Sequence, residues 1–266
     1  MSLKQKTEGA SRCSVQIENV KRHSIKMTMK AILHRLQRLW VRRSSESLIQ
    51  YYRSKGVKIG KDCVFRSTKN TKIDLMRPSL ITIGDNVDMN DHFTIMAHDF
   101  SHKVFLPLYG EFLSSSGTVS IGNNVYFGTN VTILKGGAVG DNCIIGAGSV
   151  VTKPIPSNTV AAGVPCKVIC SIEEYYAKRQ KMWIREAIVY ANTIREREHR
   201  EPTIDDFRPE FGMYVDKHNI KEYDIAPIQS RLKGLFGYWL EHHKAPFSGF
   251  NDFLEKSKLV QDVEIK

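Results

Sequence analysis

Long apolar runs are missing from this sequence of 266 residues. No segment approaches the roughly 20 consecutive apolar residues that a membrane-spanning helix needs. The beginning of the chain also lacks the pattern of a secretory signal, with its short apolar stretch and small-residue cleavage site. We therefore expect the chain to stay in the cytoplasm.

Cysteine is scarce, odd in number and scattered: the chain contains Cys13, Cys63, Cys143, Cys166 and Cys170. Such spacing does not form the disulfide framework of a small secreted protein. Cys166 and Cys170 have no second pair nearby that would complete a zinc site. We expect reduced thiols and no metal, and we interpret Cys143 and Cys166 as packing residues.

Motifs for covalent or nucleotide-dependent catalysis are absent as well. The sequence contains no nucleophile elbow, no P-loop and no dinucleotide fingerprint. If the chain transfers a chemical group, we expect direct attack of the acceptor on the donor, without an acyl-enzyme.

Negative charge is rare in the first 56 residues, where 13 Lys and Arg face 3 Asp and Glu, although the whole chain has a net charge of +11. From Ile25 to Trp40 apolar residues recur at helical spacing among basic ones. This pattern is compatible with a basic amphipathic helix on an anionic membrane face, or with a helix that caps the next domain. No aromatic and basic platform accompanies the charge, so we do not expect nucleic-acid binding.

What the sequence does contain is a strict repeat of six residues from Val119 to Val151. Its units are IGNNVY, FGTNVT, ILKGGA, VGDNCI and IGAGSV. A period of six fits neither a helix nor an ordinary strand, and it predicts a parallel β-helix whose turns have three short sides. We expect the first residue of each unit to point inward and the residue four places later to turn the corner. Gly or Asn would take the left-handed backbone positions.

The strings ITIGDNV from Ile81, VSIGNNVYFGTNV from Val119 and IGAGSVVTKPIPSNTVAAGVPCKVI from Ile145 resemble the hexapeptide-repeat acyltransferases. The likeness is to the maltose and galactoside O-acetyltransferases and to the O-acetyltransferases of surface-polysaccharide pathways. It implies an all-β core, a left-handed parallel β-helix, with α-helical extensions at both ends. It also implies acetyl-CoA as co-substrate, a carbohydrate acceptor and assembly as a homotrimer.

Three regions follow from these patterns. We expect a basic arm and amphipathic helix over residues 1–56, the β-helix over 57–170 and a helical extension over 171–266. Inside the β-helix the repeat stops at 97–118, and a loop of that length in a solenoid is typical of a functional segment. In the extension, SIEE at Ser171 and TIDD at Thr203 are helix-capping signals, and the first predicts a long helix over 171–199.

His98 is the candidate catalytic base, because it lies where the repeat gives way to the loop and because imidazole can accept a proton near neutral pH. The resemblance points to the same residue, since the catalytic histidine of the family follows the ITIGDNV coil. Asp99 is a candidate for orienting the ring or binding the acceptor. Asn70 aligns with an acceptor-binding asparagine of the galactoside branch. The stretch LMRPSL offers no clear counterpart of that branch's acidic contacts.

The candidate residues for coenzyme A lie on the later coils. Small residues would line a groove for the pantetheine arm, although each also suits an ordinary turn: Gly128, Thr129, Gly146 and Ala147. The resemblance places Tyr126 beside the cofactor. It also matches Thr152, Lys153 and Lys167 to contacts with the adenosine phosphates, which suits lysine as a mobile point charge.

We expect an acetyl-CoA-dependent O-acetyltransferase that acts on a sugar hydroxyl in surface-polysaccharide biosynthesis. The acceptor itself, and transfer to the nitrogen of an amino sugar, stay open. One rival is a zinc enzyme like the γ-class carbonic anhydrases, with His92, His98 and His102 as ligands. Another is a solenoid that binds partners without catalysis. Contact with the inner face of the membrane through the basic helix also stays open.

Overall fold

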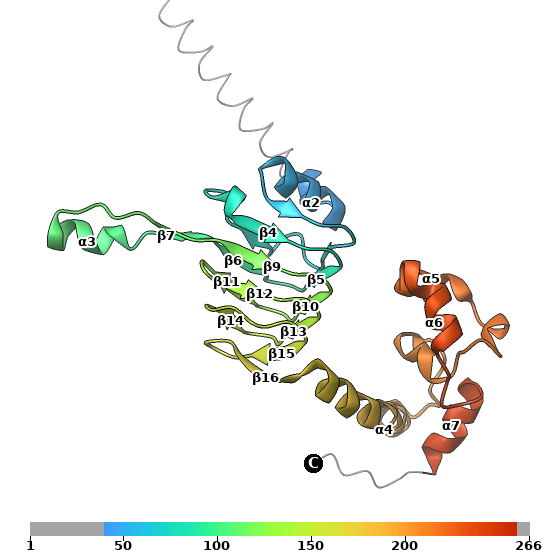
Figure 1. The fold of residues 1–266 in the computed structure, drawn as a ribbon. Coiled ribbons are helices and arrows are strands. Elements are labelled where there is room, and N and C mark those ends of the chain that lie inside the picture. The colour runs from blue at the N-terminus through green and yellow to red at the C-terminus, as the bar shows by residue number, and fades with distance from the viewer. Residues whose placement is uncertain (1–39, 260–266) are drawn as a thin grey trace, which may run out of the picture. The chain divides into compact units, whose positions relative to one another are not determined.

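The computed structural model describes residues 40–259, and the chain divides into two compact units, 1–173 and 174–266 (Figure 1). The helix expected from Ile25, with its proposed membrane contact, lies almost entirely outside the described residues. Among residues 40–259, no helix combines the length and the apolar character that crossing a bilayer requires.

The first unit contains three sheets of very short strands. The first sheet comprises β1 (Lys58–Ile59), β4 (Ile81–Ile83), β9 (Val119–Ile121) and β12 (Ala138–Val139). The second comprises β2 (Val64–Phe65), β5 (Val87–Met89), β10 (Val125–Phe127), β13 (Cys143–Ile145), β15 (Thr159–Ala162) and β16 (Lys167–Ser171). The third comprises β3 (Lys72–Ile73), β6 (Thr94–Met96), β11 (Thr132–Leu134) and β14 (Val150–Val151).

Up to β14 the chain visits these sheets in rotation, and each strand pairs in parallel with the strand of the next turn. On the regular turns, paired residues are 18 apart, as in Val125↔Cys143 and Thr132↔Val150. Three sides of six residues therefore make one turn, which confirms the parallel coil that the repeat predicts. Only the last pair, β15 with β16, is antiparallel within these three sheets.

The interior of the coil takes two residues from each six. Ile121 and Ile133 begin their units and are buried, as expected. The residue four places later was expected at the corner, but Val125 and Val131 are buried too. The left-handed backbone falls one residue earlier, at positions spaced by six: Asn124, Asn130, Gly136, Asn142 and Gly148. Asn and Gly tolerate this conformation best, so the pattern sets the corners.

Asparagines at one corner form a ladder along the coil. The side-chain amide of Asn86 donates to Asn124 (3.0 Å), that of Asn124 to Asn142 (2.9 Å) and that of Asn142 to Asn158 (2.8 Å). All four residues have a positive φ. The same side chains thus tolerate the corner conformation and join successive turns.

A helix not singled out in the sequence, α2 (Ser45–Ser54), packs on the β1 end of the coil (Figure 1). The Ser44 hydroxyl caps it by accepting from the Ser47 amide at 3.1 Å. Leu48, Ile49 and Tyr52 are buried in the same core as the coil interior. The helix therefore covers apolar surface that the first turn would otherwise expose.

Between β6 and β9 the chain leaves the coil as an arm (Figure 1). The arm contains β7 (His98–Asp99), α3 (His102–Tyr109) and β8 (Ser115–Ser116), and β7 pairs antiparallel with β8. Across it paired residues are 38 apart, as in Val87↔Val125, yet the sheets continue in register. The Gly117 amide donates to Ala97 O at 2.9 Å, so the arm closes at its base.

The second unit is helical. Its elements are α4 (Ile172–Glu198), η2 (Arg208–Met213), η3 (Ile220–Glu222), α5 (Ile225–Leu232), η4 (Lys233–Leu235), α6 (Phe236–His242) and α7 (Phe250–Lys258). The first unit also contains the short helix η1 (Pro78–Leu80). The start and end of α4 agree with the helix predicted over 171–199. Ala191 of this helix packs into a core with Phe207, Tyr214 and Phe253.

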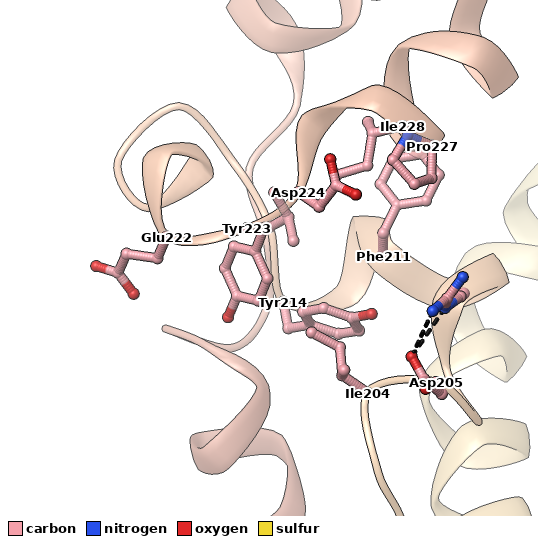
Figure 2. Close-up of a pocket in the computed structure, with 11 residues that line it drawn as sticks. Ile204, Asp205, Phe211, Tyr214, Glu222, Tyr223, Asp224, Pro227 and Ile228 are labelled. Atoms are coloured by element: carbon pink, nitrogen blue, oxygen red, sulfur yellow. Dashed lines mark hydrogen bonds and ion pairs between the residues drawn. The ribbon is translucent and has the colours of Figure 1, made fainter.

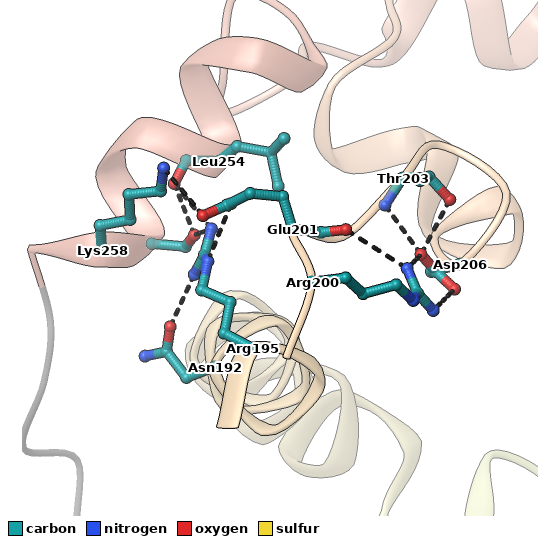
Figure 3. A network of polar contacts seen from close by, with 9 residues as sticks. Asn192, Arg195, Arg200, Glu201, Thr203, Asp206, Leu254 and Lys258 are labelled. Atoms are coloured by element: carbon teal, nitrogen blue, oxygen red, sulfur yellow. Dashed lines mark hydrogen bonds and ion pairs between the residues drawn. The ribbon is translucent and has the colours of Figure 1, made fainter. Parts of the chain in front are cut away.

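The second capping signal does not begin an α-helix. The Asp206 carboxylate accepts from the Thr203 amide (2.7 Å) and hydroxyl (2.8 Å) and pairs with Arg200 (2.7 Å), which closes a turn (Figure 3). Nearby, the Arg195 guanidinium donates to Ser257 Oγ at 3.0 Å and to Leu254 O at 3.2 Å. These bonds join α4 to α7.

Candidate active site

His98 contacts Asp74, and the stacking of two turns brings them together. β3 pairs with β6 with Ile73 opposite Ile95, and the Asp74 amide donates to Ile95 O at 3.0 Å. The Asp74 carboxylate accepts from the Ala97 amide at 3.0 Å and contacts Nδ1 of His98. The carboxylate is thus held by the backbone on one side and faces the imidazole on the other.

Both side chains are buried, with 10% of His98 and 2% of Asp74 exposed. Burial raises the pKa of Asp74, but hydrogen bonds from the His98 ring and from the Met76 and Ala97 amides outweigh it and hold the pKa below its ordinary value. A carboxylate at Nδ1 favours the tautomer with its proton there. The lone pair is then on Nε2, which has no hydrogen-bond partner among the described residues. This arrangement is suited to a general base.

Asp99 does not contact the imidazole, and the idea that it orients the ring is wrong. Its carboxylate forms an ion pair with Lys135 and accepts from the Ser115 hydroxyl at 3.1 Å and the Ser101 amide at 2.9 Å. These bonds, that to Lys135 first, hold the pKa of Asp99 well below its usual range. Asp99 thus ties the base of the arm to the coil.

Asp74, the residue that orients the ring, was missed in the sequence. It lies one place before LMRPSL, directly after the buried Ile73. A lone aspartate after a strand of an inward-facing coil is a usable signal, because a buried carboxylate needs partners. The missing piece was the register between β3 and β6.

Asn70 lies just before β3 and already has a partner in the coil. Its side-chain amide donates to Asp91 Oδ1 at 3.0 Å. Hydrogen bonds from Ser67 and Asn70 lower the pKa of Asp91 to about 2. Asn70 therefore supports the turn before β6, and its contact with an acceptor stays a prediction.

Gly128, Thr129, Gly146 and Ala147 come together at one corner of two successive turns. The Gly128 amide donates to Ile145 O and the Gly148 amide to Thr129 O, both at 2.8 Å. A Cβ added to Gly128 would lie 2.6 Å from the Ala147 nitrogen, and one on Gly146 would lie 2.7 Å from Ala162 Cβ. Stacking alone thus requires both glycines, so they are structural residues whatever binds beside them.

The other candidates for coenzyme A are exposed on the later coils. Tyr126 in β10 is 43% exposed, and its hydroxyl accepts from Asn90 Nδ2 at 3.3 Å. Thr152, Lys153 and Lys167 are exposed, and neither lysine forms an ion pair within residues 40–259. The Cys166 amide donates to Val150 O at 2.8 Å, which places the start of β16 beside β14. Exposed ammonium groups that form no ion pair within residues 40–259 can bind phosphate.

A metal site does not emerge from the described part of the chain. No three His, Cys, Asp or Glu side chains between residues 40 and 259 lie close enough to hold an ion. His92 takes a left-handed corner with φ 59°, and the His102 ring on the arm lies edge-on to Phe100 and tilted against Phe112. The two side chains therefore have local roles that differ from that of His98.

Comparison with known proteins supports a family assignment. The family model described as the hexapeptide repeat of succinyl-transferase matches residues 118–153. The galactoside O-acetyltransferase of Escherichia coli K12 is 43% identical over 119 residues, which cover 42% of this chain and 57% of that protein. The chain thus spans little more than half the length of this relative.

Two further proteins are matched over more of their length. The solved maltose O-acetyltransferase of Clostridium difficile 630 has 30% identity and a TM-score of 0.38, covering 53% of this chain and 83% of that one. The putative lipopolysaccharide biosynthesis O-acetyl transferase WbbJ of Escherichia coli K12 is 32% identical over 45% of this chain and 72% of its own length. The chain belongs to the hexapeptide-repeat acetyltransferase family.

Proposed function

We propose that the chain is an acetyl-CoA-dependent O-acetyltransferase that acts on a sugar hydroxyl. One observation carries the proposal: the His98 imidazole is held at Nδ1 by Asp74 where the coil opens into the arm, and its buried Nε2 has no hydrogen-bond partner within residues 40–259. The names of the relatives, which include galactoside and lipopolysaccharide O-acetyltransferases, support the substrate class.

In this proposal Nε2 of His98 takes the proton of the acceptor hydroxyl while the oxygen attacks the thioester carbonyl carbon. The new C–O bond forms, the C–S bond breaks, and the imidazolium returns the proton to the departing thiolate. The Asp74 carboxylate stabilises the imidazolium between these two transfers. No acyl-enzyme is needed, because the acceptor hydroxyl attacks the thioester directly. Cys143 and Cys166 are buried in the coil, and the Cys143 thiol donates to Pro156 O at 3.2 Å, so neither thiol serves as a nucleophile in this proposal.

Coenzyme A would bind along the later coils. Thr152, Lys153 and Lys167 would hold its phosphates, because both ammonium groups are exposed and free of ion pairs within residues 40–259. Tyr126 would flank the cofactor, and the glycine corner of Gly128 and Gly146 would admit the pantetheine arm with Thr129 and Ala147. Because these residues have small side chains, the surface there has room for the extended pantetheine arm.

The acceptor would bind at the arm, within reach of His98. Asp99 and Asn70 are the candidate contacts, Asp99 being 41% exposed beside Lys135. We place the reaction in the synthesis of a surface polysaccharide, with transfer to the nitrogen of an amino sugar as the alternative outcome of an acceptor screen. This reaction would take place in the cytoplasm.

The assembly proposed here is a homotrimer of left-handed coils, with clefts between neighbours. The arm supports it, because α3 and its flanks expose apolar side chains that a neighbouring coil would cover: Phe100, Val104, Leu106, Leu108, Tyr109 and Phe112. Light scattering coupled to gel filtration measures the mass directly. A monomer at micromolar concentration would contradict this part of the proposal.

The deciding experiment measures thiol release from acetyl-CoA in the presence of a panel of glycans and nucleotide sugars. We expect His98→Ala to lower turnover at least about 100-fold, and His102→Ala to retain it. A zinc enzyme would instead contain bound metal and lose activity in both variants. A non-catalytic solenoid would release no thiol with any acceptor.

A further inference from the structure

Two buried side-chain polar atoms in residues 40–259 have no hydrogen-bond partner, and they lie in different units. One is His98 Nε2, to which the proposed reaction gives a role. The other is Glu210 Oε2, in η2 of the helical unit. A buried carboxylate oxygen without a donor is costly, so this atom indicates a donor that residues 40–259 do not supply.

Glu210 lines a cavity of about 460 Å³ within the helical unit. Its lining includes Arg179, Trp183 and Tyr190 of α4, residues of η2, and Trp239 of α6. A cavity of this size accommodates a ligand of one or two rings. Its lining is of two kinds, flat aromatic surfaces and charged groups.

The aromatic surfaces are held in place. The ring of His243 stacks on Trp239 at 4.8 Å between centroids and 16° between planes, and its Nε2 donates to Gly212 O at 2.5 Å. Phe211 packs edge-on against the same indole at 5.3 Å. A rigid wall of this kind binds the apolar face of a ring at little cost in side-chain entropy.

The polar groups offer both acceptors and donors. Arg179 and Glu186 form a two-pronged ion pair with bonds of 2.6 and 2.7 Å at the rim, which leaves further guanidinium N–H groups. Burial raises the pKa of Glu210, while its own backbone amide and the charge of Arg231 oppose the rise. The guanidinium groups of Arg179 and Arg231, which act on the carboxylates of Glu186 and Glu210, disfavour a cationic ligand. Neutral hydroxyls, each able to donate and accept, match the lining better.

A neighbouring cavity of about 210 Å³ in the same unit lacks this feature (Figure 2). There Asp205 pairs with Arg208 at 2.8 Å, and Asp224 caps α5 by accepting from the Ala226 amide at 3.1 Å. Its carboxylates at these two positions are therefore satisfied by the protein. Of these two cavities, the larger one combines room with an acceptor atom that lacks a partner among residues 40–259.

We propose that the cavity between α4, η2 and α6 binds a saccharide ring, with a ring hydroxyl donating to Glu210 Oε2 and the apolar ring face packing on Trp183 or Trp239. The choice of ligand rests on the proposed function, since a glycan acceptor would supply such rings. The helical unit then serves as a carbohydrate-binding module, separate from the acetyl-transfer residues of the coil.

The test is ¹⁹F NMR of the full chain labelled with 5-fluorotryptophan, without acetyl-CoA. The sequence contains three tryptophans, so the Trp183, Trp239 and Trp40 signals can be assigned with single Trp→Phe variants. The probes are lactose, maltose, N,N′-diacetylchitobiose and a uronic-acid disaccharide, with tetramethylammonium as the cationic comparison. We expect at least one saccharide to shift the Trp183 and Trp239 signals saturably and to leave that of Trp40 unchanged.

Glu210→Gln should weaken this binding at least about tenfold, because the amide loses one charged acceptor. The matched control Glu222→Gln, at an exposed position on the neighbouring cavity, should bind as the parent does. Shifts with tetramethylammonium alone, no shift with any saccharide, or an unchanged affinity in Glu210→Gln would overturn the inference. If the shifts persist but no acceptor is acetylated, the proposed function fails and the saccharide site stands.

Discussion

Asp74 and His98 are 24 residues apart in the chain, yet the Asp74 carboxylate contacts the His98 ring because each lies just beyond one of the paired strands β3 and β6. The contact is made at the foot of the arm, where 10% of the His98 side chain and 2% of the Asp74 side chain are exposed. The His98 ring, whose Nε2 is the proposed base, is therefore positioned by the same stacking that holds the fold together.

Replacing this carboxylate tests its role. Asp74→Asn keeps the shape but removes the charge that stabilises an imidazolium, so we expect kcat to fall about 10²- to 10⁴-fold with little change in KM for acetyl-CoA. Steady-state kinetics of acetyl transfer measure both parameters. Asp62→Asn, at an exposed corner of the first turn, is the matched control and should retain full activity. A rise in KM alone would contradict the role assigned to Asp74.

The glycine corner limits what the coil tolerates. A Cβ at Gly128 meets backbone of the next turn at 2.6 Å, and that backbone cannot move without disturbing the stack. We expect Gly128→Ala to lower the free energy of unfolding by about 1–3 kcal/mol, as overpacked cores do. Thermal denaturation followed by circular dichroism measures the change.

The control for this prediction is Gly237→Ala. Nothing lies within 4 Å of a Cβ at Gly237, which is inside α6. There alanine should be neutral or stabilising, because it is the better helix former. Equal losses in the two variants would show that the close approach of the turns is not the cause.

The asparagine ladder separates conformation from hydrogen bonding. Asn142→Ala places an alanine at φ 55° and removes two ladder bonds, so we expect a loss of about 1–3 kcal/mol. Asn142→Gly removes the same bonds but accepts the left-handed backbone, so its loss should be smaller. Urea denaturation of both variants measures the difference. If glycine proves the more damaging of the two, the backbone is not the main requirement.

Stability should depend on pH through Glu210 and Asp74 with opposite signs. Burial raises the folded-state pKa of Glu210, so its contribution to stability is lost as pH rises from the unfolded value of about 4.3 through the folded one. Glu210→Gln should therefore raise the melting temperature at pH 8 and change it little at pH 4.

The folded-state pKa of Asp74 is lowered, so Asp74→Asn should destabilise the chain at pH 8, and this difference should shrink as pH falls below about 4. The same sign for both variants at pH 8 would contradict the electrostatic account.

The regular turns could be predicted from sequence because one rule governs them. From Ile121 to Val151 each six-residue unit repeats the same inward positions, and the paired residues are 18 apart, whereas β13 and β15 pair residues that are 16 apart. His98 was proposed as the base for the same reason, since it stands where the repeat stops.

The partner of His98 could not be predicted in the same way. Between the first turns paired residues are 24 apart in the first two sheets, as in Lys58↔Thr82, but 22 apart in the third, as in Ile73↔Ile95. No fixed period aligns Asp74 with the residues near His98. Asp99, the nearest carboxylate in sequence, was the natural but wrong choice, because Lys135 and Ser115 hold it elsewhere. The turn at Thr203 likewise depends on Arg200, which a local capping signal does not include.

The closed base of the arm has a consequence for how this protein could acquire new substrates. Ala97 and Gly117 are hydrogen-bonded neighbours, and the strands on either side stay in register as if the intervening residues were absent. Segments of different length or composition could therefore be exchanged between Ala97 and Gly117 without changing the strand register of the coil. Acceptor selectivity would then change with the sequence of the arm, while the contact between Asp74 and His98 at its base stays the same.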